Sequence, residues 1–262
     1  MLPPLQTAAR SGDVEELRVL LLNGVSPHST DSIGATALHW ACHGPRKAGQ
    51  IDCLKLLVEH GASVNARDTL GNTPLHFCVM LDGGTLPADN AAIMSLLIEA
   101  GADVRARTDR GREALHMAAR FGAVECTVAL LKAGASVNAR SNVGPGYAYP
   151  GTTPLEFAAA DKINHTNTAP CLHRVWPILL RAGADLPAEA DDPYLQKVID
   201  AGDWANYERR HRDKLTAMLT PTPTPTPNDG RRCSRRRLSP LRCLPPEVIR
   251  RIVAYAFHAG YY

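Results

Sequence analysis

Gly71-Asn-Thr-Pro-Leu-His76 is the stretch that decides the fold of this chain, because close variants of it recur at three other places. They read Gly34-Ala-Thr-Ala-Leu-His39, Gly111-Arg-Glu-Ala-Leu-His116 and Gly151-Thr-Thr-Pro-Leu-Glu156. A second phrase follows each copy, as Gly61-Ala-Ser-Val-Asn65, Gly101-Ala-Asp-Val-Arg105, Gly134-Ala-Ser-Val-Asn138 and Gly183-Ala-Asp-Leu186. Self-similarity at a fixed period is the sequence signature of a repeat protein.

Each copy predicts two antiparallel helices and a turn. Thr73 stands where an N-cap hydroxyl serves the first helix, and Pro74 follows at a position that needs no amide donor. A second run with helical apolar periodicity, such as residues 51–58, ends before Gly61, which can adopt the left-handed helix stop. Because a lone hairpin leaves its apolar face in water, the units must stack and share a core.

The two phrases resemble those of the ankyrin-repeat family, whose unit has about 33 residues and a Thr-Pro-Leu-His signature. The resemblance covers about residues 5–186 and implies an all-α solenoid of stacked helix-turn-helix units. We expect a solenoid over 1–186, made of an amino-terminal cap (1–31) and repeats at 32–68, 69–108, 109–141 and 142–186. Extra residues at 44–50, 82–90, 142–150 and 164–170 are expected to form loops, and residues 187–219 a carboxy-terminal helical cap.

The resemblance also implies where a partner would bind. In ankyrin proteins the hairpin tips and first helices line a concave face, and the repeat register places on it Ile33, His43, Leu70, Asn72, Met80, Arg110, Arg112, Arg120, Phe121 and Tyr149. Apolar and aromatic residues at such open positions are typical interface anchors. The alternative is that the insertions cover some of them.

Residues that suggest chemistry have a structural interpretation here. His39 and His43 have the i, i+4 spacing of metal ligands, but His39, His76 and His116 share one repeat position. The resemblance implies that this imidazole binds the backbone of the next loop, a tie that Glu156 puts in doubt in the last repeat. No catalytic motif or phosphate-binding loop is present, so we expect neither catalysis nor a cofactor nor a metal.

The seven scattered cysteines form no Cys-x-x-Cys pair, which favours reduced thiols and a location in the cytoplasm or the nucleus. No apolar run is long enough to cross a membrane. Residues 220–262 carry eight arginines against Asp229 and Glu247, which leaves residues 1–219 slightly acidic. The basic run has no interleaved aromatic residues, so nucleic acid is not the expected partner.

The tail predicts a Thr-Pro and Arg-rich linker (220–240) followed by a short amphipathic helix (241–262). Ser234 and Ser239 follow Arg-Arg-x patterns that resemble basophilic kinase sites, the alternative being a solvated linker. The helix is too short to be stable alone, so its apolar face must dock on a partner or on the solenoid. That face comprises Leu244, Val248, Ile249, Ile252, Val253 and Phe257.

Residues 244–253 also resemble the opening of an F-box, the motif that attaches substrate receptors to cullin-type ubiquitin ligases. The expected function is a monomeric, non-catalytic scaffold that binds a protein partner through the concave ankyrin surface. The alternative is a ubiquitin-ligase substrate receptor whose tail recruits the ligase adaptor.

Overall fold

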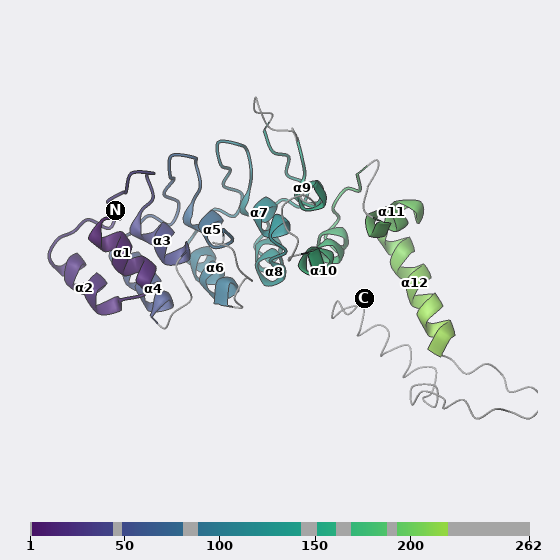
Figure 1. The fold of residues 1–262 in the computed structure, drawn as a ribbon, viewed down its shortest axis with the longest axis horizontal. Helices are drawn as coiled ribbons and strands as arrows, with labels where there is room; N and C mark the ends of the chain where they lie inside the picture. The colour runs from purple at the N-terminus through teal and green to yellow at the C-terminus, as the bar shows by residue number, and fades with distance from the viewer. Residues whose placement is uncertain are drawn as a thin grey trace, which may run out of the picture. The chain divides into compact units, whose positions relative to one another are not determined.

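The computed structural model divides the chain into two compact units, residues 1–186 and 187–262. It describes residues 2–43, 49–80, 89–142, 151–160, 169–187 and 193–219. Over these ranges the secondary structure is helical, and the one β feature is an isolated bridge between Thr30 and Thr36. The expectation of an all-α solenoid of stacked helical hairpins is confirmed, and the row of helix pairs in the first unit can be followed in Figure 1.

The first helices of the hairpins form one row, in which each helix packs against the next. They are α1 (Pro4–Ser11), α3 (Ala37–His43), α5 (Pro74–Phe77), α7 (Ala114–Arg120) and α9 (Pro154–Ala160). The second helices lie behind them, as α2 (Val14–Leu22), α4 (Gln50–Glu59), α6 (Asp89–Glu99), α8 (Val124–Lys132) and α10 (Ala169–Arg181). Each first helix contacts its own second helix, which makes the hairpin the structural unit.

The recurring leucine of the first phrase forms the core of the first row. Leu38, Leu75, Leu115 and Leu155 are all at most 1% exposed, and Leu5 takes the same position in the amino-terminal cap. Complete burial of a leucine side chain contributes about 1.5–3 kcal/mol to folding. The core is therefore a line of equivalent leucines, each packed between neighbouring repeats.

Helix α5 departs from the regular pattern because it is only four residues long, whereas α3 and α7 each have seven. The repeat register aligns His43, Met80 and Arg120. His43 and Arg120 are the last residues of α3 and α7, whereas Met80 lies beyond the end of α5. Met80 thus lies outside a helix, at a position where the neighbouring repeats are still helical.

The second unit contains α11 (Pro193–Asp200) and α12 (Trp204–Leu219), which contact each other. Leu195 and Val198 on α11 are fully buried, and Trp204 at the start of α12 is 8% exposed. No helix in the described ranges combines the length and the apolar character that a membrane crossing requires.

Candidate protein-binding surface

Short hairpin loops before the first helices share one geometry, which we call the fingers: residues 31–35, 68–72 and 108–112. In the first two, an aspartate at the base accepts hydrogen bonds from the loop amides: Asp31 from Ile33 N and Ala35 N at 2.9 Å, and Asp68 from Leu70 N and Asn72 N at 2.9 and 2.7 Å. In the third finger, Thr108 accepts from Arg112 N instead. A polar side chain at the base therefore fixes each fingertip.

Backbone hydrogen bonds also join each fingertip to the next. The amide of Thr69 donates to the carbonyl oxygen of Ile33 at 2.9 Å, and that of Asp109 donates to Leu70 at 3.0 Å. In the same way, the amide of Asn142 donates to the carbonyl oxygen of Arg110 at 2.8 Å. The spacing of the tips is thus set by the main chain, and Ile33 (43% exposed), Leu70 (57% exposed) and the exposed Arg110 occupy equivalent positions on a row.

The recurring histidines tie each hairpin to the following finger, as the resemblance implied. Nδ1 of His39, His76 and His116 accepts from the amide of the residue three positions earlier, at 3.1 to 3.2 Å. Nδ1 is therefore the acceptor, and Nε2 donates to the carbonyl oxygens of Asn72, Arg112 and Thr152, at 3.1, 3.1 and 3.2 Å respectively. Each imidazole is neutral in this arrangement because both of its nitrogens are already assigned.

Burial strengthens that preference for the neutral ring. It lowers the pKa of His76 to about 4 and that of His116 to about 4, in each case because desolvation disfavours the imidazolium. Burial also lowers the pKa of His39. These groups hold the frame together at neutral pH, and their position in the core accounts for their recurrence without a metal.

Two units have another residue at the histidine position, and that residue makes hydrogen bonds of its own. Glu156 Oε2 accepts from the amide of Thr153 at 2.8 Å, which reproduces the bond within the turn. No hydrogen bond links Glu156 to a later turn within the residues that the structure describes. In the cap, Gln6 takes the position and donates to the carbonyl oxygen of Ser29 at 2.8 Å.

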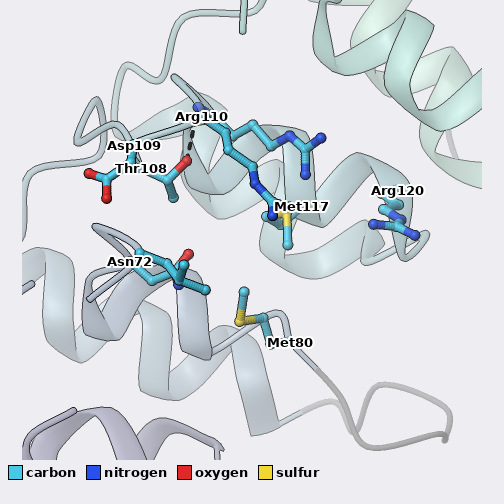
Figure 2. Close-up of a pocket in the computed structure, with 9 residues that line it drawn as sticks. Asn72, Met80, Thr108, Asp109, Arg110, Met117 and Arg120 are labelled. Carbon is cyan, nitrogen blue, oxygen red and sulfur yellow. Dashed lines mark hydrogen bonds between the residues drawn. The ribbon is translucent and has the colours of Figure 1, made fainter. Parts of the chain in front are cut away.

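A pocket of about 270 Å³ opens between the second and third fingers and the helices behind them (Figure 2). We call it the methionine–arginine pocket, and its lining residues are Leu70, Asn72, Met80, Thr108, Asp109, Arg110, Arg112, Met117 and Arg120. Six of the ten sequence-predicted partner-binding residues lie in it: Leu70, Asn72, Met80, Arg110, Arg112 and Arg120. Residues from two consecutive repeats thus converge on one concavity.

The other predicted residues lie elsewhere. Ile33 is on the neighbouring fingertip, and His43 packs edge-on against the rings of Trp40 and Phe77, with centroids 5.6 and 5.8 Å away. Phe121 follows α7, where the guanidinium of Arg120 lies 5.6 Å from its ring centroid. Tyr149, Ser234, Ser239 and the tail residues Leu244, Val248, Ile249, Ile252, Val253 and Phe257 lie outside the described residues.

Asn72 has a structural role in addition to its place in the pocket. Its side chain is 6% exposed, and its amide nitrogen donates to Asp68 Oδ2 at 2.8 Å. Its contribution to a partner contact is therefore limited to the small area that remains open.

Sequence reasoning missed the large residue that follows the histidine position. Trp40, Phe77, Met117 and Phe157 occupy it in successive repeats, and two of them, Trp40 and Phe157, provide surfaces for arginine side chains. Arg10 lies 5.1 Å from the Trp40 ring centroid, and Arg112 lies 4.4 Å from that of Phe157. The repeat register alone could have shown this column of large side chains.

The asparagine of the second phrase was also missed. Asn65 donates to the carbonyl oxygen of Gly101 at 3.1 Å and accepts from Asp103 N at 2.8 Å. Asn138 makes the same pair of bonds to Gly183 O and Asp185 N. In the unit between them Arg105 takes the position and donates to Gly134 O at 2.9 Å. These residues therefore link the turns that follow the second helices of successive repeats.

Metal chemistry finds no support in the part of the chain that the structure describes. No group of three or more His, Cys, Asp or Glu side chains could hold an ion there. Cys42, Cys53, Cys78 and Cys126 are buried, and burial raises the pKa of Cys53 to about 11, which disfavours the nucleophilic thiolate.

Comparison with known proteins agrees with this geometry. A family model for ankyrin repeats, described as three copies, matches residues 5–85 and 85–173. Osteoclast-stimulating factor 1 of Rattus norvegicus is 48% identical over 44 residues, which are 17% of this chain and 21% of that protein. The Gallus gallus and Bos taurus proteins of that name are 48% identical over 44 residues and 49% over 41, and the matches cover 22% and 19% of their lengths, and 17% and 16% of this chain. The chain thus spans about a fifth of the length of the curated relatives it matches.

Proposed function

This chain belongs to the ankyrin-repeat family, and we propose that it is a non-catalytic scaffold that holds a partner protein against its fingers and first helices. The observation that carries the proposal is the convergence of Leu70, Met80 and three arginines on one pocket beside the row of fingertips. Methionine and arginine are enriched at protein interfaces, and both are present here on a frame fixed by the main chain.

The exposed fingertips supply the test, because the chain carries a matched pair of apolar residues elsewhere. Ile33 and Leu70 are 43% and 57% exposed on the fingers, while Val19 and Leu22 are 54% and 74% exposed on α2. We would capture partners from cell lysate with the full chain, with Ile33→Ser/Leu70→Ser and with Val19→Ser/Leu22→Ser, and identify them by mass spectrometry.

We expect the finger variant, Ile33→Ser/Leu70→Ser, to lose partners that the wild type retains. The α2 variant, Val19→Ser/Leu22→Ser, should retain them. Both variants replace exposed side chains, so each should keep the wild-type melting temperature to within a few degrees. Partners that survive the finger changes and disappear with the α2 changes would place the binding surface elsewhere and contradict the proposal.

Several features accompany the proposed function. The protein acts as a monomer in the cytoplasm or the nucleus, with residues 187–219 as a helical cap of the solenoid, residues 220–240 as a linker and Ser234 and Ser239 as phosphorylation sites. Sedimentation analysis and fluorescence microscopy of the full chain would test the monomer and the location. Mass spectrometry of the protein isolated from cells would test the two serines.

A second function is favoured by the sequence of the tail. Residues 244–253 resemble the opening of an F-box, so the protein would be a substrate receptor that presents its ankyrin-bound partner to a ubiquitin ligase. A pull-down with the full chain and with a chain that ends at residue 239 separates the two functions. Recovery of a cullin adaptor with the full chain alone supports the receptor, and its absence from both leaves the scaffold.

A further inference from the structure

We propose that the methionine–arginine pocket binds an apolar side chain of the partner that has an aspartate or a glutamate within two residues of it. The inference rests on the proposed function, because it names the chemistry of the partner segment that this surface takes.

The size of the pocket suits amino-acid side chains. Its volume of about 270 Å³ lies below the range of roughly 300–1,000 Å³ that is typical of sites for drug-sized ligands and cofactors. One or two side chains of an extended segment would fill it. The rest of such a segment would run over the neighbouring fingertips, whose spacing the backbone hydrogen bonds fix.

Apolar atoms form the walls where the anchor would lie. The Met80 and Met117 side chains face each other across the gap in Figure 2, and Leu70 lines the pocket from the fingertip with 57% of its surface exposed. Methionine is unbranched and polarizable, so two of them adapt to leucine, isoleucine, methionine or phenylalanine. Met80 lines the pocket from beyond the end of α5, which stops at Phe77.

Positive charge surrounds these walls. Arg110, Arg112 and Arg120 line the pocket, and the one carboxylate among its described lining residues, that of Asp109, lies 2.9 Å from the guanidinium of Arg67. Among the lining residues that the structure describes, three arginines therefore stand against one aspartate. A carboxylate is the complementary group, and a guanidinium can bind it with two parallel hydrogen bonds.

Aromatic contacts orient two of the three arginines. The Arg112 guanidinium lies 4.4 Å from the centroid of the Phe157 ring, and that of Arg120 lies 5.4 Å from the same ring. Guanidinium groups packed on aromatic rings have already lost part of their conformational freedom, so less entropy is lost when an anion binds. A carboxylate beside the apolar anchor would meet partly preorganised donors.

The apolar walls favour a peptide over a nucleic acid. A nucleic-acid strand would place phosphates along a basic groove and stack its bases on exposed aromatic rings. None of the described lining residues is aromatic, and the rings of Phe77 and Phe157 nearby are only 5% and 7% exposed. A nucleotide bound here would place its phosphate near the arginines but would find no ring on which to stack its base. An acidic and apolar peptide would use both the arginines and the apolar walls.

The test starts from a random dodecapeptide phage library selected on the full chain. Selected peptides are synthesised with a fluorescein label and titrated by fluorescence anisotropy against Arg110→Glu, Arg120→Gln and Leu70→Ser. Arg18→Glu and Leu22→Ser are the matched controls, since both positions are exposed on α2 and outside the pocket. A labelled 20-nucleotide single-stranded DNA is titrated against the same proteins.

We expect a consensus with an acidic residue within two positions of Leu, Ile, Met or Phe. Arg110→Glu should weaken binding at least about tenfold, Arg120→Gln and Leu70→Ser should weaken it measurably, and the two controls should stay within about twofold of wild type. Circular dichroism melts that match wild type confirm that the fold of each variant is intact.

Four results would overturn the inference. The first three are a library that yields no binding peptide, a consensus that lacks acidic residues, and DNA binding that falls with Arg110→Glu while peptide affinity does not. The fourth is a peptide affinity that none of Arg110→Glu, Arg120→Gln and Leu70→Ser changes, which would leave the scaffold function standing. The scaffold proposal fails if the lysate partners survive Ile33→Ser/Leu70→Ser and are lost with Val19→Ser/Leu22→Ser.

Discussion

The Nε2 atom of His76 lies 3.1 Å from the backbone carbonyl oxygen of Arg112, 36 residues further along the chain. This hydrogen bond joins the hairpin that carries Met80 to the finger that carries Arg110 and Arg112. The two sides of the methionine–arginine pocket are therefore held together by a core histidine that does not itself line the pocket. The histidine frame and the pocket are therefore joined at this contact.

Replacement of His76 by alanine should lower the free energy of unfolding by about 2–4 kcal/mol. The change leaves the amide of Thr73 and the carbonyl oxygen of Arg112 without their imidazole partner in the core and removes buried ring atoms. Urea denaturation followed by circular dichroism measures the loss. His28→Ala is the control, because His28 is exposed, and it should change stability by less than about 0.5 kcal/mol. Equal stability of the two variants would contradict the role of the tie.

Stability should fall as the pH drops from about 6.5 to about 4. The pKa values of His76 and His116 are near 4 in the folded protein and rise to the ordinary 6.5 on unfolding, so between these limits the unfolded chain binds more protons. The full contribution is present above pH 6.5, and each histidine accounts for at most about 3 kcal/mol of the loss. Burial raises the pKa of Glu113, which acts in the opposite direction.

Urea denaturation at pH 7.5, 6.0, 5.0 and 4.5 measures this dependence. The slope should be shallower in His76→Gln, because that variant has one fewer buried imidazole to protonate. A wild-type stability that stays constant from pH 7.5 to 4.5 would show that the histidines titrate normally in the folded state.

Gly71→Ala should destabilise the protein far more than Gly61→Ala. Both glycines have positive φ, +74° and +80°, and so carry the left-handed penalty of about 1 kcal/mol. A Cβ atom on Gly71 would lie 2.8 Å from the backbone nitrogen of Asp109, which donates to Leu70 between the fingers, whereas nothing lies within 4 Å of one on Gly61. We expect a total cost of about 3 kcal/mol at Gly71. Thermal unfolding of the two variants measures the difference, and similar losses would contradict the close approach.

Asn65→Ala should cost about 1–2 kcal/mol, because it removes two hydrogen bonds to the next turn, to Gly101 O and Asp103 N. The exposed Asn23 follows α2, and Asn23→Ala is the matched control, with an expected change below about 0.5 kcal/mol. Chemical denaturation compares the two variants. A loss at Asn23 as large as the loss at Asn65 would show that the inter-repeat bonds contribute nothing.

The regular parts of the fold could be predicted because each is encoded within a few neighbouring residues. Leu75 is buried, His76 reaches the next finger and Gly61 adopts positive φ. All three features could be predicted because residues of these types recur at fixed distances within each hairpin. The length of α5 could not be predicted in this way. Met80 follows a helix that ends at Phe77, although the repeat register aligns it with the last helical residues of α3 and α7.

The sequence by itself determined the repeat, the helical hairpins, the column of histidines and the surface on which Leu70, Met80 and Arg110 lie, because periodic phrases fix which face each residue occupies. Only the tertiary structure decided that these side chains meet in one pocket, with Met117 as a further wall and Phe157 beneath the arginines. The physical reason is that the pocket is built between repeats. Its shape depends on how adjacent hairpins stack and where α5 ends, and neither property is encoded in any single phrase.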